Sequence, residues 1–188
     1  SSAETLRTRA LKFSPHDEFL AVAVMNQIYL YETETQKLVH TFSAHTKEVS
    51  AIVFNEDGSR LISGGLDQMI YIWDMKTYEQ INQLSHKSID SGIIQIATTP
   101  DIQFYAIGFA SGAIGIYNES FTSPMTSFDA HSQELMNIAV SPLDCSLATA
   151  SKDKTIKVWS MGRVASSKFT LETHSDVVLT VNFSPTTN

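Results

Sequence analysis

Cysteine is nearly absent from this chain of 188 residues, which contains Cys145 and no other. A single thiol excludes an internal disulfide and a cysteine-rich metal site, because each of these needs several cysteines. Secreted domains often depend on disulfides, so the lack of cysteine favours an intracellular protein.

Long apolar runs are also missing. No stretch approaches the roughly 18 residues that a membrane-spanning helix needs. The opening sequence, Ser-Ser-Ala-Glu-Thr-Leu-Arg, lacks the apolar core of a signal peptide. We therefore expect no membrane span and a cytoplasmic or nuclear location.

Basic residues are few and scattered. The chain carries 13 Lys and Arg residues against 20 Asp and Glu residues, and its formal net charge is −7. Binding of nucleic acid phosphates needs clustered Lys and Arg, so nucleic acid is not expected to be the main partner. Hydrophobic content of 43% is ordinary for a folded globular protein, which argues against disorder as the main state.

What the chain does contain is an internal repeat. Asp67 lies 22 residues after His45, and Trp73 lies six residues after Asp67. The same spacing returns from His131 through Asp153 to Trp159. Self-similarity at a fixed period indicates a repeat architecture, in which recurring polar residues can serve the structure of each repeat.

Turn signals follow the same period. Phe-Ser-Pro at 13–15 and at 183–185 marks the first and last of five equivalent slots, which begin at residues 13, 54, 98, 140 and 183. Short alternating apolar runs fill the sequence between the slots, four per repeat, without a convincing helical period. This pattern predicts antiparallel all-β units. Four-stranded units cannot bury both faces alone and must stack, as the blades of a propeller do.

The repeats differ in quality. We place them at about 8–42, 45–84, 88–128 and 131–171, with a partial fifth at 174–188 that contributes one strand. Repeats two and four contain the complete His, Asp and Trp spacing. In repeat one, Tyr31 takes the position of the Trp and Met25 or Asn26 that of the Asp. In repeat three, Tyr117 and Ser111 take these positions, and the His position falls near His86 or Ser88.

With His45, Asp67 and Trp73-Asp74 placed, the chain resembles the WD-repeat β-propeller family over residues 8–185. The resemblance implies that His, Asp, Trp and a Ser or Thr of the second strand form a structural hydrogen-bond network. By position, its members are His45, Ser63, Asp67, Trp73, His131, Thr149, Asp153 and Trp159. Repeats one and three lack these residues, so we expect packing alone to hold their hairpins.

The number of blades stays open at this point. The family usually closes a ring of about seven blades, whereas the chain supplies four blades and one strand. We favour part of a longer ring, completed by further repeats of the parent chain. The alternative is a minimal four-bladed ring in which the last strand completes the first blade.

Catalytic and metal sites are not expected. Ser63, His45 and Asp67 match the residue types of a Ser-His-Asp hydrolase. The set recurs with Thr149 in place of the Ser, and no Gly-x-Ser-x-Gly motif is present, which favours a structural role. A zinc site shared by His45, His131 and His174 is not expected either. Each His belongs to a different blade, so the three side chains should lie too far apart to bind one metal ion. We predict no enzyme, no metal and no cofactor.

The resemblance implies a protein-interaction scaffold that binds peptides or partner domains within a multiprotein complex. The alternative is a regulatory or sensor propeller region of a larger enzyme or switch protein. Function in such a scaffold lies in its loops. The predicted partner-binding face consists of Lys47, Glu48, Leu66, Gln133, Glu134 and Lys152.

Overall fold

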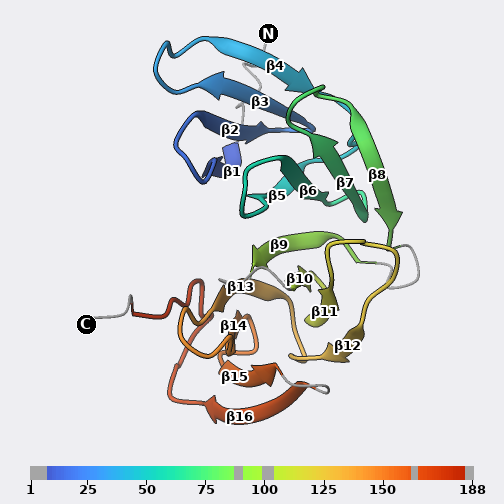
Figure 1. The fold of residues 1–188 in the computed structure, drawn as a ribbon. Helices are drawn as coiled ribbons and strands as arrows, with labels where there is room; N and C mark the ends of the chain where they lie inside the picture. The colour runs from blue at the N-terminus through green and yellow to red at the C-terminus, as the bar shows by residue number, and fades with distance from the viewer. Residues whose placement is uncertain (1–7, 87–90, 99–103, 162–164, 185–188) are drawn as a thin grey trace, which may run out of the picture. The chain divides into compact units, whose positions relative to one another are not determined.

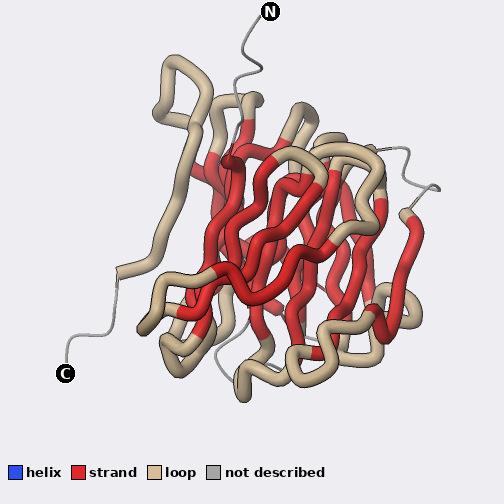
Figure 2. Tube along the Cα trace, turned by 90° about the horizontal axis from the view of Figure 1, so that it is seen from above, coloured by secondary structure: helices blue, strands red, loops and turns tan. Residues whose placement is uncertain are grey.

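The structure, a computed structural model, describes residues 8–86, 91–98, 104–161 and 165–184. Within these ranges the chain consists of β-strands joined by turns and loops (Figure 2). The strands form four antiparallel sheets of four strands each, which confirms the predicted all-β fold. The chain divides into two compact units, unit 1 at Ser1–Lys87 and unit 2 at Ser88–Asn188.

Unit 1 contains the first two sheets, blades 1 and 2 (Figure 1). In each blade the strands pair in chain order, so every connection is a hairpin. Blade 1 consists of β1 (Thr8–Phe13), β2 (Phe19–Val24), β3 (Gln27–Glu32) and β4 (Leu38–Phe42). Blade 2 consists of β5 (Val49–Phe54), β6 (Arg60–Gly65), β7 (Met69–Asp74) and β8 (Gln80–Ser85).

Unit 2 repeats this arrangement in blades 3 and 4. Blade 3 consists of β9 (Ile93–Thr98), β10 (Tyr105–Phe109), β11 (Ala113–Tyr117) and β12 (Thr126–Asp129). Blade 4 consists of β13 (Leu135–Val140), β14 (Leu147–Ser151), β15 (Ile156–Met161) and β16 (Ala165–Leu171).

A polar side chain follows the first strand at three of the predicted turn slots and closes the turn. The Oγ of Ser14 accepts a hydrogen bond from the Phe19 N–H at 3.0 Å. The Oδ1 of Asn55 accepts one from the Arg60 N–H at 2.8 Å. The Oγ of Ser141 accepts one from the Leu143 N–H at 3.2 Å. Such local bonds favour a turn over a continued strand, which explains the regular spacing of the hairpins.

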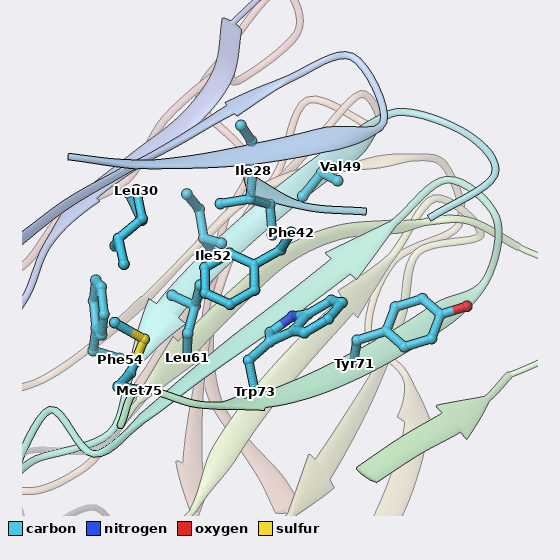
Figure 3. Close-up of a cluster of buried hydrophobic side chains, with 12 residues drawn as sticks. Ile28, Leu30, Phe42, Val49, Ile52, Phe54, Leu61, Tyr71, Trp73 and Met75 are labelled. Carbon is cyan, nitrogen blue, oxygen red and sulfur yellow. The ribbon is translucent and has the colours of Figure 1, made fainter. Parts of the chain in front are cut away.

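The core of unit 1 lies between its two blades. Buried side chains of β2, β3 and β4 pack against buried side chains of β5, β6 and β7. Along β2 and β3 every second residue takes part, as the period of two residues in a strand requires. Figure 3 shows the Phe42 ring beside the Trp73 indole, and their centroids lie 4.9 Å apart. The blades bury a common set of side chains: Ala21, Ala23, Ile28, Leu30, Phe42, Val49, Ile52, Phe54, Leu61, Tyr71, Trp73 and Met75.

The core of unit 2 is built the same way. Phe128 of blade 3 packs against Trp159 of blade 4 at a centroid distance of 4.8 Å. Blades 3 and 4 approach closely at Gly108, where an added Cβ would lie 2.1 Å from Cδ2 of Leu135. The shared cluster contains Ala106, Ile114, Ile116, Ala130, Leu135, Ile138, Leu147 and Trp159. Burial of each large aliphatic side chain contributes about 1.5–3 kcal/mol.

The strand predicted in the fifth repeat is not formed within residues 172–184, which are a loop (Figure 1). The loop still contacts blade 4. The Val178 N–H donates to the Ser151 carbonyl at 3.2 Å, and the Val181 N–H donates to Oδ1 of Asn137 at 3.0 Å. A strand needs a backbone ladder along a neighbouring strand, and these two isolated bonds do not provide one.

Candidate functional site

The predicted network residues of blade 2 form one chain of hydrogen bonds. The Trp73 Nε1–H donates to Oγ of Ser63 at 3.0 Å. The Ser63 hydroxyl then donates to Nε2 of His45 at 2.9 Å, and the Nδ1–H of His45 donates to the Asp67 carboxylate at 3.0 Å. These directions follow because indole nitrogen only donates and an ionised carboxylate only accepts.

Asp67 also fixes the backbone around the network. Its carboxylate accepts hydrogen bonds from the Thr46 N–H at 2.8 Å and from the Met69 N–H at 3.2 Å. Burial opposes ionisation of Asp67, but the hydrogen bonds from His45 and the backbone hold its pKa below the usual value. The carboxylate is therefore ionised at neutral pH and ties the loop before β5 to the β6–β7 turn.

Blade 4 carries the equivalent network with Thr149 in place of Ser63. The Trp159 Nε1–H donates to Oγ1 of Thr149 at 3.0 Å. His131 lies 2.7 Å from this Oγ1 through Nε2 and 2.9 Å from the Asp153 carboxylate through Nδ1. Burial lowers the pKa of His131, despite the opposing carboxylate. A hydroxyl of Thr155, 2.7 Å from Oδ1 of Asp153, adds a further donor.

The electrostatics of Asp153 resemble those of Asp67. Burial raises its pKa, whereas hydrogen bonds from Thr155 and His131 lower it by more, to about 2. The imidazole of His131 is thus neutral and Asp153 is ionised at pH 7. The hydroxyls of Ser63 and Thr149 are fully buried, at 0% exposure, and each accepts an indole N–H. This arrangement joins the loop before the first strand of the blade to its second and third strands and encloses the hydroxyl.

The prediction that packing alone holds the hairpin is wrong for blade 3, and in blade 1 the β2–β3 turn is hydrogen-bonded to the loop of blade 2. In blade 1, Nδ2 of Asn26 donates to the His45 carbonyl at 3.1 Å. In blade 3, the Ser111 N–H donates to Oγ of Ser91 at 2.7 Å. Short polar side chains can make backbone hydrogen bonds without the full network, so the absence of a His-Asp-Trp set does not exclude such bonds.

Aromatic packing replaces the network in the interior of blade 3. Tyr117, in the Trp position, is fully buried and stacks on Phe121 with a centroid distance of 5.9 Å. Burial raises the pKa of Tyr117 to about 12. Of the two candidates for the His position, Ser88 lies outside the described residues. His86 belongs to unit 1, where its N–H donates to the Gln68 carbonyl at 2.8 Å.

The structure brings together the first three residues of the predicted partner-binding face, which we call face A: Lys47, Glu48 and Leu66. Lys47 and Glu48 lie in the loop before β5, and Leu66 lies in the β6–β7 turn. The Leu66 N–H donates to the Glu48 carbonyl at 2.9 Å. The Glu48 carboxylate forms an ion pair with Arg9 of β1. Lys47 is exposed.

The other three residues, which we call face B, also meet: Gln133, Glu134 and Lys152. The Lys152 N–H donates to the Glu134 carbonyl at 2.9 Å, and the side chains of Lys152 and Glu134 form an ion pair. The Ser151 hydroxyl donates to the carbonyls of Gln133 and Glu134 at 3.2 and 2.9 Å. Faces A and B are equivalent positions of blades 2 and 4.

A cavity of about 470 Å³ opens at face A. The three residues of face A line this cavity. Three further lining residues were not predicted from the sequence: Met25, Asn26 and Thr46. Met25 and Asn26 form the β2–β3 turn of blade 1, so the cavity spans the junction of blades 1 and 2. The signal in the sequence was the replacement of the Asp in repeat one by Met25-Asn26.

A second cavity, of about 490 Å³, lies at the opposite end of blade 1. It is acidic and is lined by His16, Asp17, Glu18, Phe19, Glu32 and Glu34. Within the described residues, no group of three or more His, Cys, Asp or Glu side chains is arranged to hold a metal ion. In the same residues no helix is long and apolar enough to cross a membrane.

Comparison with known families identifies the repeats. The WD40 family model, described as WD domain, G-beta repeat, matches residues 36–74 and 122–160. Each match runs from the last strand of one blade through the third strand of the next. The matched ranges contain both complete networks, from His45 to Trp73 and from His131 to Trp159.

Curated relatives are similar over most of the chain. Protein HIR1 of Eremothecium gossypii is 27% identical over 154 residues, covering 75% of this chain and 19% of that protein. WD repeat-containing protein 18 of Danio rerio is 25% identical over 175 residues, covering 92% of this chain and 32% of that protein. Target of rapamycin complex subunit wat1 of Schizosaccharomyces pombe is 24% identical over 198 residues, covering 80% of this chain and 63% of that protein.

The chain spans about a fifth to a third of the length of the first two of these relatives. Its four four-stranded sheets have the strand order of propeller blades. Together with the two matched repeats, the sheets and the relatives support a WD-repeat family for this chain.

Proposed function

We propose that the chain is a non-catalytic protein-interaction scaffold, whose loops bind peptides or partner domains within a multiprotein complex in the cytoplasm or nucleus. The observation that carries this proposal is the display of faces A and B on loops held by the buried networks. The name of wat1 describes that relative as the subunit of a complex, which supports a comparable role for this chain.

Rigid display supports binding at face A. Asp67 holds the backbone of Thr46, and the Leu66 N–H holds the carbonyl of Glu48. The loop and the turn are therefore fixed before a partner arrives, which reduces the entropy lost on binding. Face B is held in the same manner, because Asp153 accepts the Ser132 N–H at 3.2 Å.

Burial of the network hydroxyls supports the non-catalytic part of the proposal. A nucleophilic hydroxyl must reach a substrate, with a general base beside it. Ser63 and Thr149 have a His beside them but are enclosed, and each hydroxyl oxygen is occupied by an indole donor.

The test is a fourfold substitution in the full-length protein: Glu48→Ala, Leu66→Ala, Glu134→Ala and Lys152→Ala. Partners are captured on the immobilised protein and quantified by mass spectrometry. We expect the specific partners of the wild type to be lost while the melting temperature stays within about 3 °C. Lys152 is exposed and the other three side chains are half-buried, and substitutions outside the core usually change stability little. A matched control, Glu18→Ala with Glu34→Ala at the acidic cavity, should retain the partners. Undiminished capture by the fourfold variant would show that these faces do not bind them.

A further inference from the structure

The cavity at face A has the size of a binding site for a side chain and its flanking backbone. Its volume of about 470 Å³ lies within the 300–1,000 Å³ typical of ligand pockets. One wall is the Met25-Asn26 turn of blade 1. The other is formed by Thr46, Lys47 and Leu66 of blade 2.

Met25 gives the cavity an apolar wall in an unusual backbone position. Its φ is +53°, in the left-handed region that a non-glycine residue rarely adopts, and its side chain is 37% exposed. The conformation is held by the Val49 N–H, which donates to the Met25 carbonyl at 2.7 Å. Methionine adapts to irregular apolar partners, and Leu66 faces the same cavity, half-buried.

The charges at the cavity leave one group available for a ligand. The Glu48 carboxylate is paired with Arg9, and the Asp67 carboxylate is occupied by His45 and by backbone donors. Lys47 is exposed and makes no ion pair with any described residue. An apolar side chain followed by a carboxylate would therefore match both the walls and the free ammonium group.

The corresponding turn of unit 2 approaches the loop of the next blade closely. Gly112, in the β10–β11 turn, has a φ of +91°, and its carbonyl accepts the N–H groups of Ala130 and His131, both at 3.1 Å. An added Cβ at Gly112 would lie 2.5 Å from the carbonyl oxygens of His131 and Gln133. The turn of blade 3 thus lies directly on the loop of blade 4.

The side chains of face B in unit 2 also differ from those of face A. Lys152 occupies the position of Leu66 and is paired with Glu134, so face B offers a charged pair where face A offers an apolar wall. The apolar lining of the cavity at the junction of blades 1 and 2 is therefore not repeated at the equivalent positions of blade 4.

We propose that the face A cavity binds a peptide segment in which a large apolar side chain inserts between Met25 and Leu66 while an adjacent acidic residue pairs with Lys47. This inference rests on the proposed function, because it specifies the partner chemistry at one of its two faces.

The probe is a set of fluorescein-labelled peptide pools, 12 residues long, with the central pair fixed as Leu-Glu, Leu-Gln, Leu-Lys or Ser-Glu and the other positions randomised. Binding to the full-length protein is measured by fluorescence anisotropy. We expect Leu-Glu to bind tightest and Leu-Lys to bind about two- to tenfold more weakly, because an exposed ion pair makes a modest contribution. Ser-Glu should show at least a tenfold loss, because the apolar contact is removed.

Two variants and one matched control make the test specific. Leu66→Lys, which copies the residue of blade 4, should weaken Leu-Glu binding at least tenfold. Lys47→Glu should reverse the preference between Leu-Glu and Leu-Lys. Lys152→Leu in blade 4 should change neither result. Circular dichroism and melting temperature verify that each variant is folded.

Equal binding of Leu-Glu and Leu-Lys, or binding that Leu66→Lys leaves unchanged, would overturn the inference. So would absence of binding by all pools. If the fourfold variant still loses its natural partners in that case, the scaffold function stands and only the ligand chemistry is wrong. If the fourfold variant also keeps its partners, both proposals fail.

Discussion

Blades 1 and 2 in unit 1 and blades 3 and 4 in unit 2 meet through corresponding strands but with different polar contacts. In unit 2, Oε1 of Gln95 accepts the Ile138 N–H at 3.1 Å and Nδ2 of Asn137 at 2.8 Å, so an amide side chain joins β9 to β13. In unit 1 the positions equivalent to Gln95 and Asn137 are Ala10 and Ala51. There the ion pair between Arg9 and Glu48 crosses the junction.

The difference continues in the turn that leads to the third strand. Gly112 brings the turn of blade 3 onto the loop of blade 4, whereas Met25 leaves a cavity beside the loop of blade 2. The buried networks of blades 2 and 4 are nevertheless nearly identical. The network therefore maintains the blade, while the junction between blades can vary and acquire a binding role.

The largest expected change in stability distinguishes blades 2 and 4, which contain the buried network, from blades 1 and 3, which lack it. Trp73→Ala and Trp159→Ala should each lower the free energy of unfolding by about 3–5 kcal/mol, because each removes a buried indole and orphans a hydroxyl. Tyr31→Ala, at the half-buried Trp position of blade 1, should cost clearly less. Urea denaturation of the three variants checks the order. Equal costs for Tyr31 and Trp73 would remove the distinction between the two kinds of blade.

The next largest change in stability is expected in the turns between the second and third strands of blades 3 and 1. Gly112→Ala should destabilise the protein by about 2–3 kcal/mol, because Ala is strained at a φ of +91° and its Cβ meets two carbonyl oxygens. Met25→Gly should change stability by less than about 1 kcal/mol, since Gly relieves the left-handed strain but loses a partly exposed side chain. Thermal and urea denaturation measure both. A harmless Gly112→Ala would show that the unit 2 junction is open.

The network of blade 4 should respond to pH. His131→Ala should cost about 1–3 kcal/mol at pH 7.5, as it removes one hydrogen bond from the buried Thr149 hydroxyl and one from the Asp153 carboxylate. Because the pKa of His131 is lowered in the folded chain, the unfolded chain binds more protons below pH 6.5. Wild-type stability then falls as the pH drops from 6.5, so the difference between wild type and variant should shrink at pH 5.5. Denaturation at both pH values tests this, and a constant difference would contradict the neutral imidazole.

The smallest effect tests the amide contact of unit 2. Asn137→Ala should cost about 1 kcal/mol, because the bonds to Gln95 and to the Val181 N–H are lost. Ala51→Asn, the reciprocal change in unit 1, should give no gain because Ala10 offers it no amide partner. Hydrogen exchange should show faster exchange in β13 for the first variant. Unchanged exchange there would mean that the Asn137 amide does not help to join β9 to β13.

Much of the fold could be predicted from the sequence, because each hairpin is a local unit. Alternating apolar residues and turns closed by Ser14, Asn55 and Ser141 act within a few residues of one another. The contacts between His45, Asp67 and Trp73 were anticipated by the family resemblance. These contacts join neighbouring strands of a single blade.

The cavity could not be predicted, because it depends on contacts between blades. Whether the loop of blade 2 is open depends on Met25, and the partner of Glu48 is Arg9, a residue of another blade. Repeat alignment compares equivalent positions and does not show which residues meet across a junction. The prediction of a strand within residues 172–184 was wrong, because a strand also depends on contacts with a neighbouring strand. The apolar alternation of this loop matches a strand, but no neighbouring strand forms a backbone ladder with it.

The most direct test compares the two junctions in one experiment, by hydrogen exchange of the full-length protein with and without a saturating Leu-Glu peptide pool. The account predicts slower exchange in the β2–β3 turn and in the loop before β5, which line the face A cavity. Exchange around Gly112 and in the loop before β13 should stay unchanged. Equal slowing at both junctions, or at neither, would contradict the claim that the junction of blades 1 and 2 is the one built to bind.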